Sequence, residues 1–194
     1  MRDALGVGGA IVVAGAAIFY LVEIFRGETR PQRVSWAVWA VIGVLGYGTA
    51  SAGGAGAGAY VAGVYMVACI ATFAVSLAPR YGKPGGARYD WPLGAIAIAG
   101  LVLWRSGTLP DDAGAALAVG CDAIALWPTM RGALQAPRSE SRGAWTADVV
   151  GNTMAVGALN SHAFASAAYP VYLLVATAVI AGILWARQTP KSRT

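Results

Sequence analysis

Residues 5–39 read LGVGGAIVVAGAAIFYLVEIFRGETRPQRVSWAVW, which is a long apolar run, a short basic turn and the start of a second apolar run. A helix that crosses a bilayer needs about 20 consecutive and mostly apolar residues, and the run at 5–25 meets this requirement. It is too long for the apolar core of a signal peptide and leads directly into charged residues, so we expect a retained helix. The stretch predicts a membrane protein whose helices are joined by short basic connections.

The rest of the chain continues this pattern. Of its 194 residues, 57% are hydrophobic and only 12% are charged, whereas about 25% are charged in a typical soluble domain. The apolar runs do not alternate with polar residues as the strands of a membrane barrel must. The predicted fold class is therefore an all-α polytopic membrane protein with seven transmembrane helices. The candidate helices are residues 5–25, 34–52, 58–79, 91–107, 113–132, 143–159 and 163–186.

The distribution of basic residues predicts how these helices are oriented. With seven crossings the connections alternate between the two sides, and one side then holds only Arg2 and Arg105 of the 14 Lys and Arg. Cytoplasmic connections carry the excess of Lys and Arg. We therefore expect a bacterial-type inner or plasma membrane protein with its N-terminus outside and its C-terminus in the cytoplasm. The basic residues lie in short gaps between apolar runs, so the lipid bilayer is the expected partner and nucleic acid is not.

An internal repeat relates the two halves of the chain. The segment RGETRPQRVSWAVW at 26–39 recurs loosely as RGALQAPRSESRGAW at 131–145. The repeat predicts two parallel three-helix bundles, residues 1–82 and 111–194, with a linker helix between them in residues 83–110. Parallel repeats of this kind occur in transporters, where the site lies between the halves. Three residues keep an offset of 106: Pro31, Ser35 and Trp39 match Pro137, Ser141 and Trp145.

This three-plus-one-plus-three layout, with a proline-containing basic turn after the first helix of each unit, resembles the SWEET and PQ-loop family of sugar and amino-acid transporters. The first turn carries Pro31-Gln32. In the second half, Pro128, Ser141, Trp145 and Asn152 are similar to the family's first-helix proline, basic turn and second-helix polar residue. The resemblance implies a carrier for a sugar or another small polar metabolite. It also implies that Pro31, Pro128 and Pro170 act as hinge or gating positions.

Polar side chains within the apolar runs are the candidate substrate ligands. Acidic residues are costly at membrane depth and usually face a cavity or a partner. Asp122 lies near the middle of its run, whereas Glu23 and Asp148 lie closer to the ends of theirs. On the run at 143–159, residues spaced by three and seven share one stripe, and the corresponding stripe of the run at 34–52 carries a tryptophan. The candidates are Asp122, Asp148, Asn152, Trp145, Trp39 and Glu23.

Structural roles for these residues stay open as alternatives. Glu23 could pair with Arg26, Asp148 could be an interfacial acid near Arg142, and Asp122 could form a hydrogen bond between helices. The stripe itself could be a helix-packing surface. Four hydroxyl side chains could either line the cavity or belong to the core: Tyr65, Thr72, Tyr172 and Thr177.

The sequence favours an alternating-access carrier over two other functions. One alternative is an intramembrane enzyme that uses its buried carboxyls as acid and base on a lipid-like substrate. The other is a non-transporting subunit or scaffold of a membrane complex, and homo-oligomers are also compatible with the Gly/Ala-rich faces. Both lysines lie outside the apolar runs, which excludes a retinal Schiff base. One histidine and two separated cysteines argue against haem or zinc, so no cofactor, metal or catalytic residue is assigned.

Overall fold

The structure is a computed structural model that describes residues 1–28, 30–82, 88, 90–135, 137 and 141–187, without the side chain of Pro128. The described residues contain helices and no β-strand, which confirms the all-α fold class. The elements are α1 (Arg2–Arg26), α2 (Arg33–Ala52), the short 3₁₀ helix η1 (Gly56–Ala59), α3 (Tyr60–Ser76), α4 (Asp90–Arg105), α5 (Asp111–Gln135), α6 (Arg142–Gly157) and α7 (Phe164–Arg187).

Each predicted run corresponds to one helix, with differences at the ends. The run at 58–79 is the least regular, because its glycine-rich start forms η1 and the α-helix begins only at Tyr60. Within the described residues, five helices are long and apolar enough to span a membrane: α1, α2, η1 with α3, α5 and α7. Helices α4 and α6 have 16 residues each, which is about 24 Å at 1.5 Å per residue, against a hydrocarbon core of about 30 Å. The crossing of the membrane by α4 and α6 stays a prediction.

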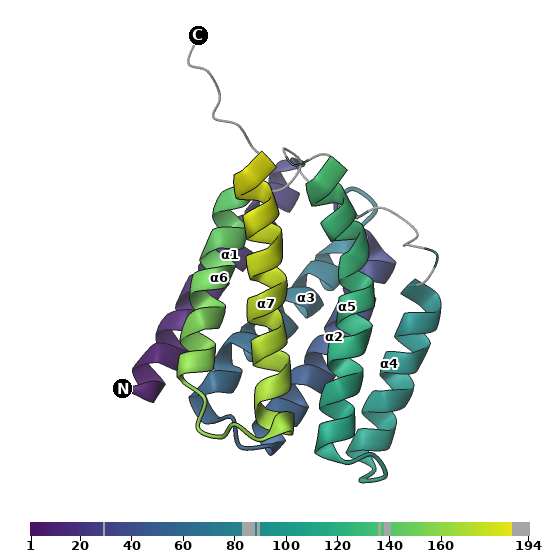
Figure 1. The fold of residues 1–194 in the computed structure, drawn as a ribbon. Coiled ribbons are helices and arrows are strands. Elements are labelled where there is room, and N and C mark those ends of the chain that lie inside the picture. Colours follow the sequence, from purple (N-terminus) through teal and green to yellow (C-terminus); the bar gives the residue numbers. More distant parts are fainter. Residues whose placement is uncertain (29, 83–87, 89, 136, 138–140, 188–194) are drawn as a thin grey trace.

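The helices pack with the same neighbours in both halves of the chain. Helix α3 packs against α1 and α2, and α7 packs against α5 and α6. Between the halves, α1 contacts α6 and α2 contacts α5. The first half is hereafter α1–α3 with η1, and the second half is α5–α7. The start of α1 and the end of α7 lie at opposite ends of the bundle (Figure 1).

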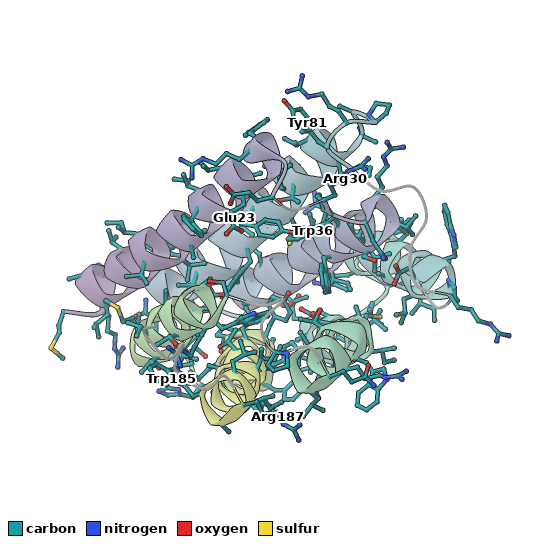
Figure 2. All side chains as sticks on the ribbon, turned by 90° about the horizontal axis from the view of Figure 1, so that it is seen from above. Glu23, Arg30, Trp36, Tyr81, Trp185 and Arg187 are labelled. Carbon is teal, nitrogen blue, oxygen red and sulfur yellow. The ribbon has the colours of Figure 1, made fainter. Side chains whose placement is uncertain are left out.

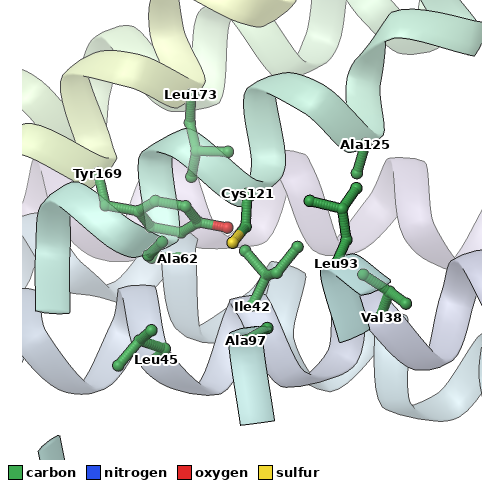
Figure 3. Packing of buried hydrophobic residues seen from close by; sticks show 11 residues of the cluster. Val38, Ile42, Leu45, Ala62, Leu93, Ala97, Cys121, Ala125, Tyr169 and Leu173 are labelled. Atoms are coloured by element: carbon green, nitrogen blue, oxygen red, sulfur yellow. The ribbon is translucent and has the colours of Figure 1, made fainter. Parts of the chain in front are cut away.

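The linker helix α4 packs along one side of the bundle, where it contacts both α2 and α5. A buried apolar cluster fills this region and brings together side chains of α2, α3, α4, α5 and α7 (Figure 3). Ile42 and Leu45 of α2 are fully buried in it. The α2–α5 side of the molecule is thus held by large side chains. The cluster consists of Val38, Ile42, Leu45, Ala62, Leu93, Ala97, Ala118, Cys121, Ala125, Tyr169 and Leu173.

The outer surface carries exposed apolar side chains, as expected where a helix faces lipid. Ile11 and Ile18 of α1 and Val67 of α3 are among them. An open groove of about 670 Å³ runs along this face between α1 and α3 and is lined almost entirely by apolar atoms. Water-exposed apolar surface of this extent is unusual in a soluble monomer, so the surface favours a membrane setting.

Candidate functional site

A group of polar side chains lies where α2, α3, α5, α6 and α7 meet between the two halves. Its members are linked to one another by hydrogen bonds or by electrostatic interactions. The two halves both contribute to it, as the site of a two-bundle carrier requires. This central cluster consists of Trp39, Tyr65, Cys69, Asp122, Asp148, Asn152, Tyr169, Tyr172 and Thr177.

One side of the central cluster surrounds Asp122, which lies near the middle of α5 and is only 8% exposed. The Tyr169 hydroxyl donates to Asp122 Oδ2 at 2.9 Å. The Trp39 indole and the Tyr172 hydroxyl interact with the same carboxylate. Trp39 Nε1 and Tyr172 Oη are nevertheless buried, and neither atom has a hydrogen-bond partner among the described residues. Asp122 therefore faces three donor groups, of which one forms a hydrogen bond.

The other side of the central cluster is organised by Asn152, whose side chain is 0% exposed. Asn152 Nδ2 donates to Tyr65 Oη at 3.0 Å, to the Asp148 carbonyl oxygen at 2.9 Å and to Thr177 Oγ1 at 3.4 Å. The Tyr65 hydroxyl also interacts with the Asp148 carboxylate. Asn152 Oδ1 is buried and has no hydrogen-bond partner. This side of the cluster thus offers acceptors that nothing in the described chain uses.

The two sides of the central cluster adjoin each other at Cys69 of α3. Its thiol interacts electrostatically with Asp122 and with Tyr65. The arrangement therefore holds two carboxylates, an amide and several aromatic rings in one region. Such a set of groups can bind a polar solute by hydrogen bonds and by contacts with the rings.

The structure brings together four of the six predicted ligands: Trp39, Asp122, Asp148 and Asn152. Trp145 instead packs within the second half, against a buried cluster of Ala133, Ile180 and Leu184. Glu23 is half-buried near the end of α1 and lies over the first half in the view from that end of the bundle (Figure 2). Neither Trp145 nor Glu23 belongs to the central cluster.

The three predicted hinge prolines have different settings. Pro31 is buried just before α2 begins. Pro170 is buried inside the continuous helix α7, directly after the cluster residue Tyr169. The side chain of Pro128 lies outside the described residues, so its role stays a prediction.

The main omission of the sequence analysis is Tyr169, which is not among its candidate residues. Tyr169 and Tyr172 are three residues apart and therefore lie on one helix face, and their rings are 6.1 Å apart in the structure. This spacing was the available signal. It could not identify Asp122 as the partner, because the rotation of α7 about its own axis is set by packing against α5.

The described residues can also be searched for a metal-binding site. Within the described ranges, no three His, Cys, Asp or Glu side chains gather in a way that could hold a metal ion. The candidate site is thus a set of hydrogen-bonding and aromatic groups. Comparisons of the chain with protein-family models, with curated proteins and with solved structures found no match.

Proposed function

We propose that this protein is a membrane carrier that moves a small polar solute by alternating access between its two halves. The observation that carries the proposal is the set of buried atoms without partners at the junction of the halves: Asn152 Oδ1, Trp39 Nε1 and Tyr172 Oη. A buried polar group without a partner costs about 1–3 kcal/mol. A bound solute that supplies the missing partners would recover this free energy.

The proposal includes seven membrane crossings and a relation to the SWEET and PQ-loop transporters. It is supported by the matching helix neighbours of the two halves and by the position of the start of α1 and the end of α7 at opposite ends of the bundle (Figure 1). The bundle has a basic end, defined here by Arg26, Arg33, Arg142 and Arg187. In this proposal the basic end is cytoplasmic in a bacterial-type inner or plasma membrane.

At the opposite end of the bundle, named here the closed end, the two halves are in direct backbone contact. It comprises residues 53–59 of the first half and 158–166 of the second. The Asn160 N–H donates to the Ala55 carbonyl oxygen at 3.1 Å. Gly58 has no side chain, and a Cβ atom there would lie 2.6 Å from Leu159 Cδ2 and 3.0 Å from the Ala155 carbonyl oxygen. The glycines of this turn therefore permit direct contact between the halves.

At the basic end, several hydrogen bonds hold each half together separately. Arg30 Nη2 donates to the Pro79 carbonyl oxygen at 2.8 Å, and Arg33 Nε donates to that of Ser76 at 2.5 Å. In the second half, Arg187 Nη1 donates to the Leu134 carbonyl oxygen at 3.3 Å. Figure 2 shows Arg30 over the first half and Arg187 over the second. Separating the halves at this end breaks none of these bonds, which favours rocking about the central cluster.

A reversible lock of the closed end tests the carrier mechanism. A Cβ atom on Gly56 would lie 3.3 Å from Asn160 Cβ, close to the span of about 3.5–4.5 Å that a disulfide bridges. The variant Gly56→Cys with Asn160→Cys is made with Cys69→Ala and Cys121→Ala. In proteoliposomes, uptake of radiolabelled glucose, alanine or putrescine should stop after oxidation and return after reduction.

The two single-cysteine variants, Gly56→Cys and Asn160→Cys in the same background, are the matched controls, because each contains one of the substitutions and cannot form the disulfide. Their uptake should not respond to oxidation. Uptake by the oxidised double variant at the reduced rate would refute alternating access at this end. Failure of the unsubstituted protein to move any of these solutes faster than protein-free vesicles would count against a carrier.

A further inference from the structure

The two carboxylates of the central cluster differ in the number of hydrogen-bond donor groups that lie beside them. Asp122 accepts a hydrogen bond from Tyr169 and has the Trp39 indole and the Tyr172 hydroxyl beside it. Asp148 has one side-chain donor beside it, the Tyr65 hydroxyl, which accepts a hydrogen bond from Asn152 and keeps its own hydrogen for the carboxylate. The groups here that can take further hydrogen bonds are acceptors: the Asp148 carboxylate, which can accept more than the one bond that Tyr65 offers, and Asn152 Oδ1, which has no partner among the described residues.

No cation of the described chain pairs with Asp148. Arg142 is the first residue of α6, and its guanidinium lies over the Trp185 ring at 4.1 Å from the ring centroid. Helix α3 contains no basic residue, and Arg187 is the last residue of α7. Asp148 is half-buried, and a carboxylate that is partly withdrawn from water without a counter-charge is costly. A positively charged ligand would remove that cost.

The chemistry of the free groups separates ligand classes. A sugar hydroxyl both donates and accepts hydrogen bonds, whereas an ammonium group has three donors and no acceptor. The acceptors around Asp148 match the second class. Aromatic rings next to the site add to this preference, because a ring face attracts a cation within about 6 Å. Tyr65 contributes such a ring beside Asp148, and Trp39, Tyr169 and Tyr172 contribute rings beside Asp122.

We infer that the solute of the proposed carrier is a small organic cation whose ammonium group binds between the Asp148 carboxylate and Asn152 Oδ1. The inference rests on the proposed function only for transport, since binding at this site can be measured without it. Asp122, which accepts a hydrogen bond from Tyr169, then has a structural role in the site. Asp148 is the residue that selects a positively charged solute.

Three four-carbon probes of equal length test the inference: putrescine with two ammonium groups, 4-amino-1-butanol with one and 1,4-butanediol with none. Equilibrium binding of radiolabelled putrescine to the purified full-length protein in detergent is measured in competition with the other two. Binding should strengthen from the diol to the amino alcohol and to putrescine, with no measurable competition by the diol. Competition by the diol as strong as that by the amino alcohol would overturn the inference.

Substitutions at Asp148 and Asp122 test which carboxylate binds the ammonium group. Asp148→Asn keeps the shape of the side chain and should weaken putrescine binding by about 30-fold or more. Asp148→Glu keeps the charge and should recover part of the affinity, which a general defect in folding would not allow. Asp122→Asn should weaken binding less, because that carboxylate has its own donors. Unchanged affinity in Asp148→Asn would refute the site.

Failure of this inference and failure of the carrier proposal are distinguishable. Uptake of glucose or alanine that stops when the closed end is oxidised, without any putrescine binding, would overturn the cation site and leave the carrier. Putrescine binding that depends on Asp148, with no uptake of any solute by the reduced protein, would support the cation site and remove the carrier.

Discussion

The two halves of the molecule use matching residues for different purposes. Ser35 and Ser141 are equivalent in the sequence repeat. Ser35 lies inside α2 and donates to Asp90 Oδ2 of the linker helix α4 at 2.5 Å. Ser141 instead precedes α6 and accepts a hydrogen bond from the Ala144 N–H at 3.3 Å, which makes it the N-cap of that helix. The linker helix packs against α2 and not against α6, so the same residue type has a different neighbour in each half.

The polar residues of the central cluster show the same divergence. At the repeat offset, Asp148 corresponds to Ile42 and Asn152 to Gly46. Ile42 is a fully buried core residue, and Gly46 lies so close to Tyr169 that a Cβ atom there would be 2.5 Å from its ring. The second half supplies the carboxylates and the amide, while the first supplies packing surface and aromatic rings. The repeat thus accounts for the scaffold, and divergence between its copies accounts for the site.

The two main helix pairs between the halves, α1–α6 and α2–α5, pack in different ways. At the first pair a glycine lies against backbone, and at the second a glycine lies against a side chain. This difference gives the largest predicted change in stability. A Cβ atom on Gly9 of α1 would lie 2.7 Å from the Gly151 carbonyl oxygen of α6. Before the basic turn the repeat offset is 105, as between Arg26 and Arg131, so the equivalent position in α5 is Gly114. A Cβ atom there would lie 2.8 Å from Thr49 Cγ2, a side-chain atom. Since backbone cannot move aside as a methyl group can, Gly9→Ala should lower the free energy of unfolding by about 2–3 kcal/mol and Gly114→Ala by less.

Gly15→Ala is the matched control on α1, because nothing lies within 4 Å of a Cβ atom at that position. It should raise the free energy of unfolding by about 0.5–1 kcal/mol, since alanine is the better helix former. Thermal unfolding of the detergent-solubilised variants measures all three changes. Equal losses in the free energy of unfolding for Gly9→Ala and Gly114→Ala would show that α1–α6 and α2–α5 tolerate an added methyl group equally.

The sequence was sufficient to predict the helices, because apolar length and terminal charge are local properties. It was insufficient at the glycine-rich start of α3, where apolar composition does not distinguish η1 from an α-helix. It also grouped Trp145 with Asn152, since both share a stripe on α6. In the structure Trp145 packs on Ala133 within its own half. A stripe on a helix meets different neighbours along its length, and the spacing of residues cannot show which.

Depth indicated Asp122, and the spacing on one stripe of α6 indicated Asp148 and Asn152. Asp122, Asp148 and Asn152 all lie in the central cluster, because each polar group placed far from water must find a partner inside the bundle. Their tyrosine partners were harder to predict. Tyr65 and Tyr169 reach the cluster only through the rotation of α3 and α7 about their axes, and these helices are apolar on all sides and give little sign of their orientation.

The two tyrosines beside Asp122 provide the second test, because one forms a hydrogen bond and the other does not. Tyr169→Phe removes the donor at 2.9 Å from Asp122 Oδ2 and should lower the free energy of unfolding by about 2 kcal/mol. Tyr172→Phe removes a buried hydroxyl that has no hydrogen-bond partner among the described residues, so the free energy of unfolding should stay the same or rise. Thermal unfolding without added solute distinguishes them, and a larger loss in Tyr172→Phe would contradict the described geometry around Asp122.

The equivalent serines provide the smallest effect and the most direct test of divergence between the halves. Ser35→Ala removes a hydrogen bond to Asp90, whose side chain is only 2% exposed, and should lower the free energy of unfolding by about 1.5 kcal/mol. Ser141→Ala removes an exposed cap with a longer hydrogen bond of 3.3 Å and should cost about 0.5 kcal/mol. Amide hydrogen exchange locates each loss. Protection should fall in α4 for Ser35→Ala and in the first turn of α6 for Ser141→Ala, whereas loss in the same helix for both would mean that the two serines have kept one role.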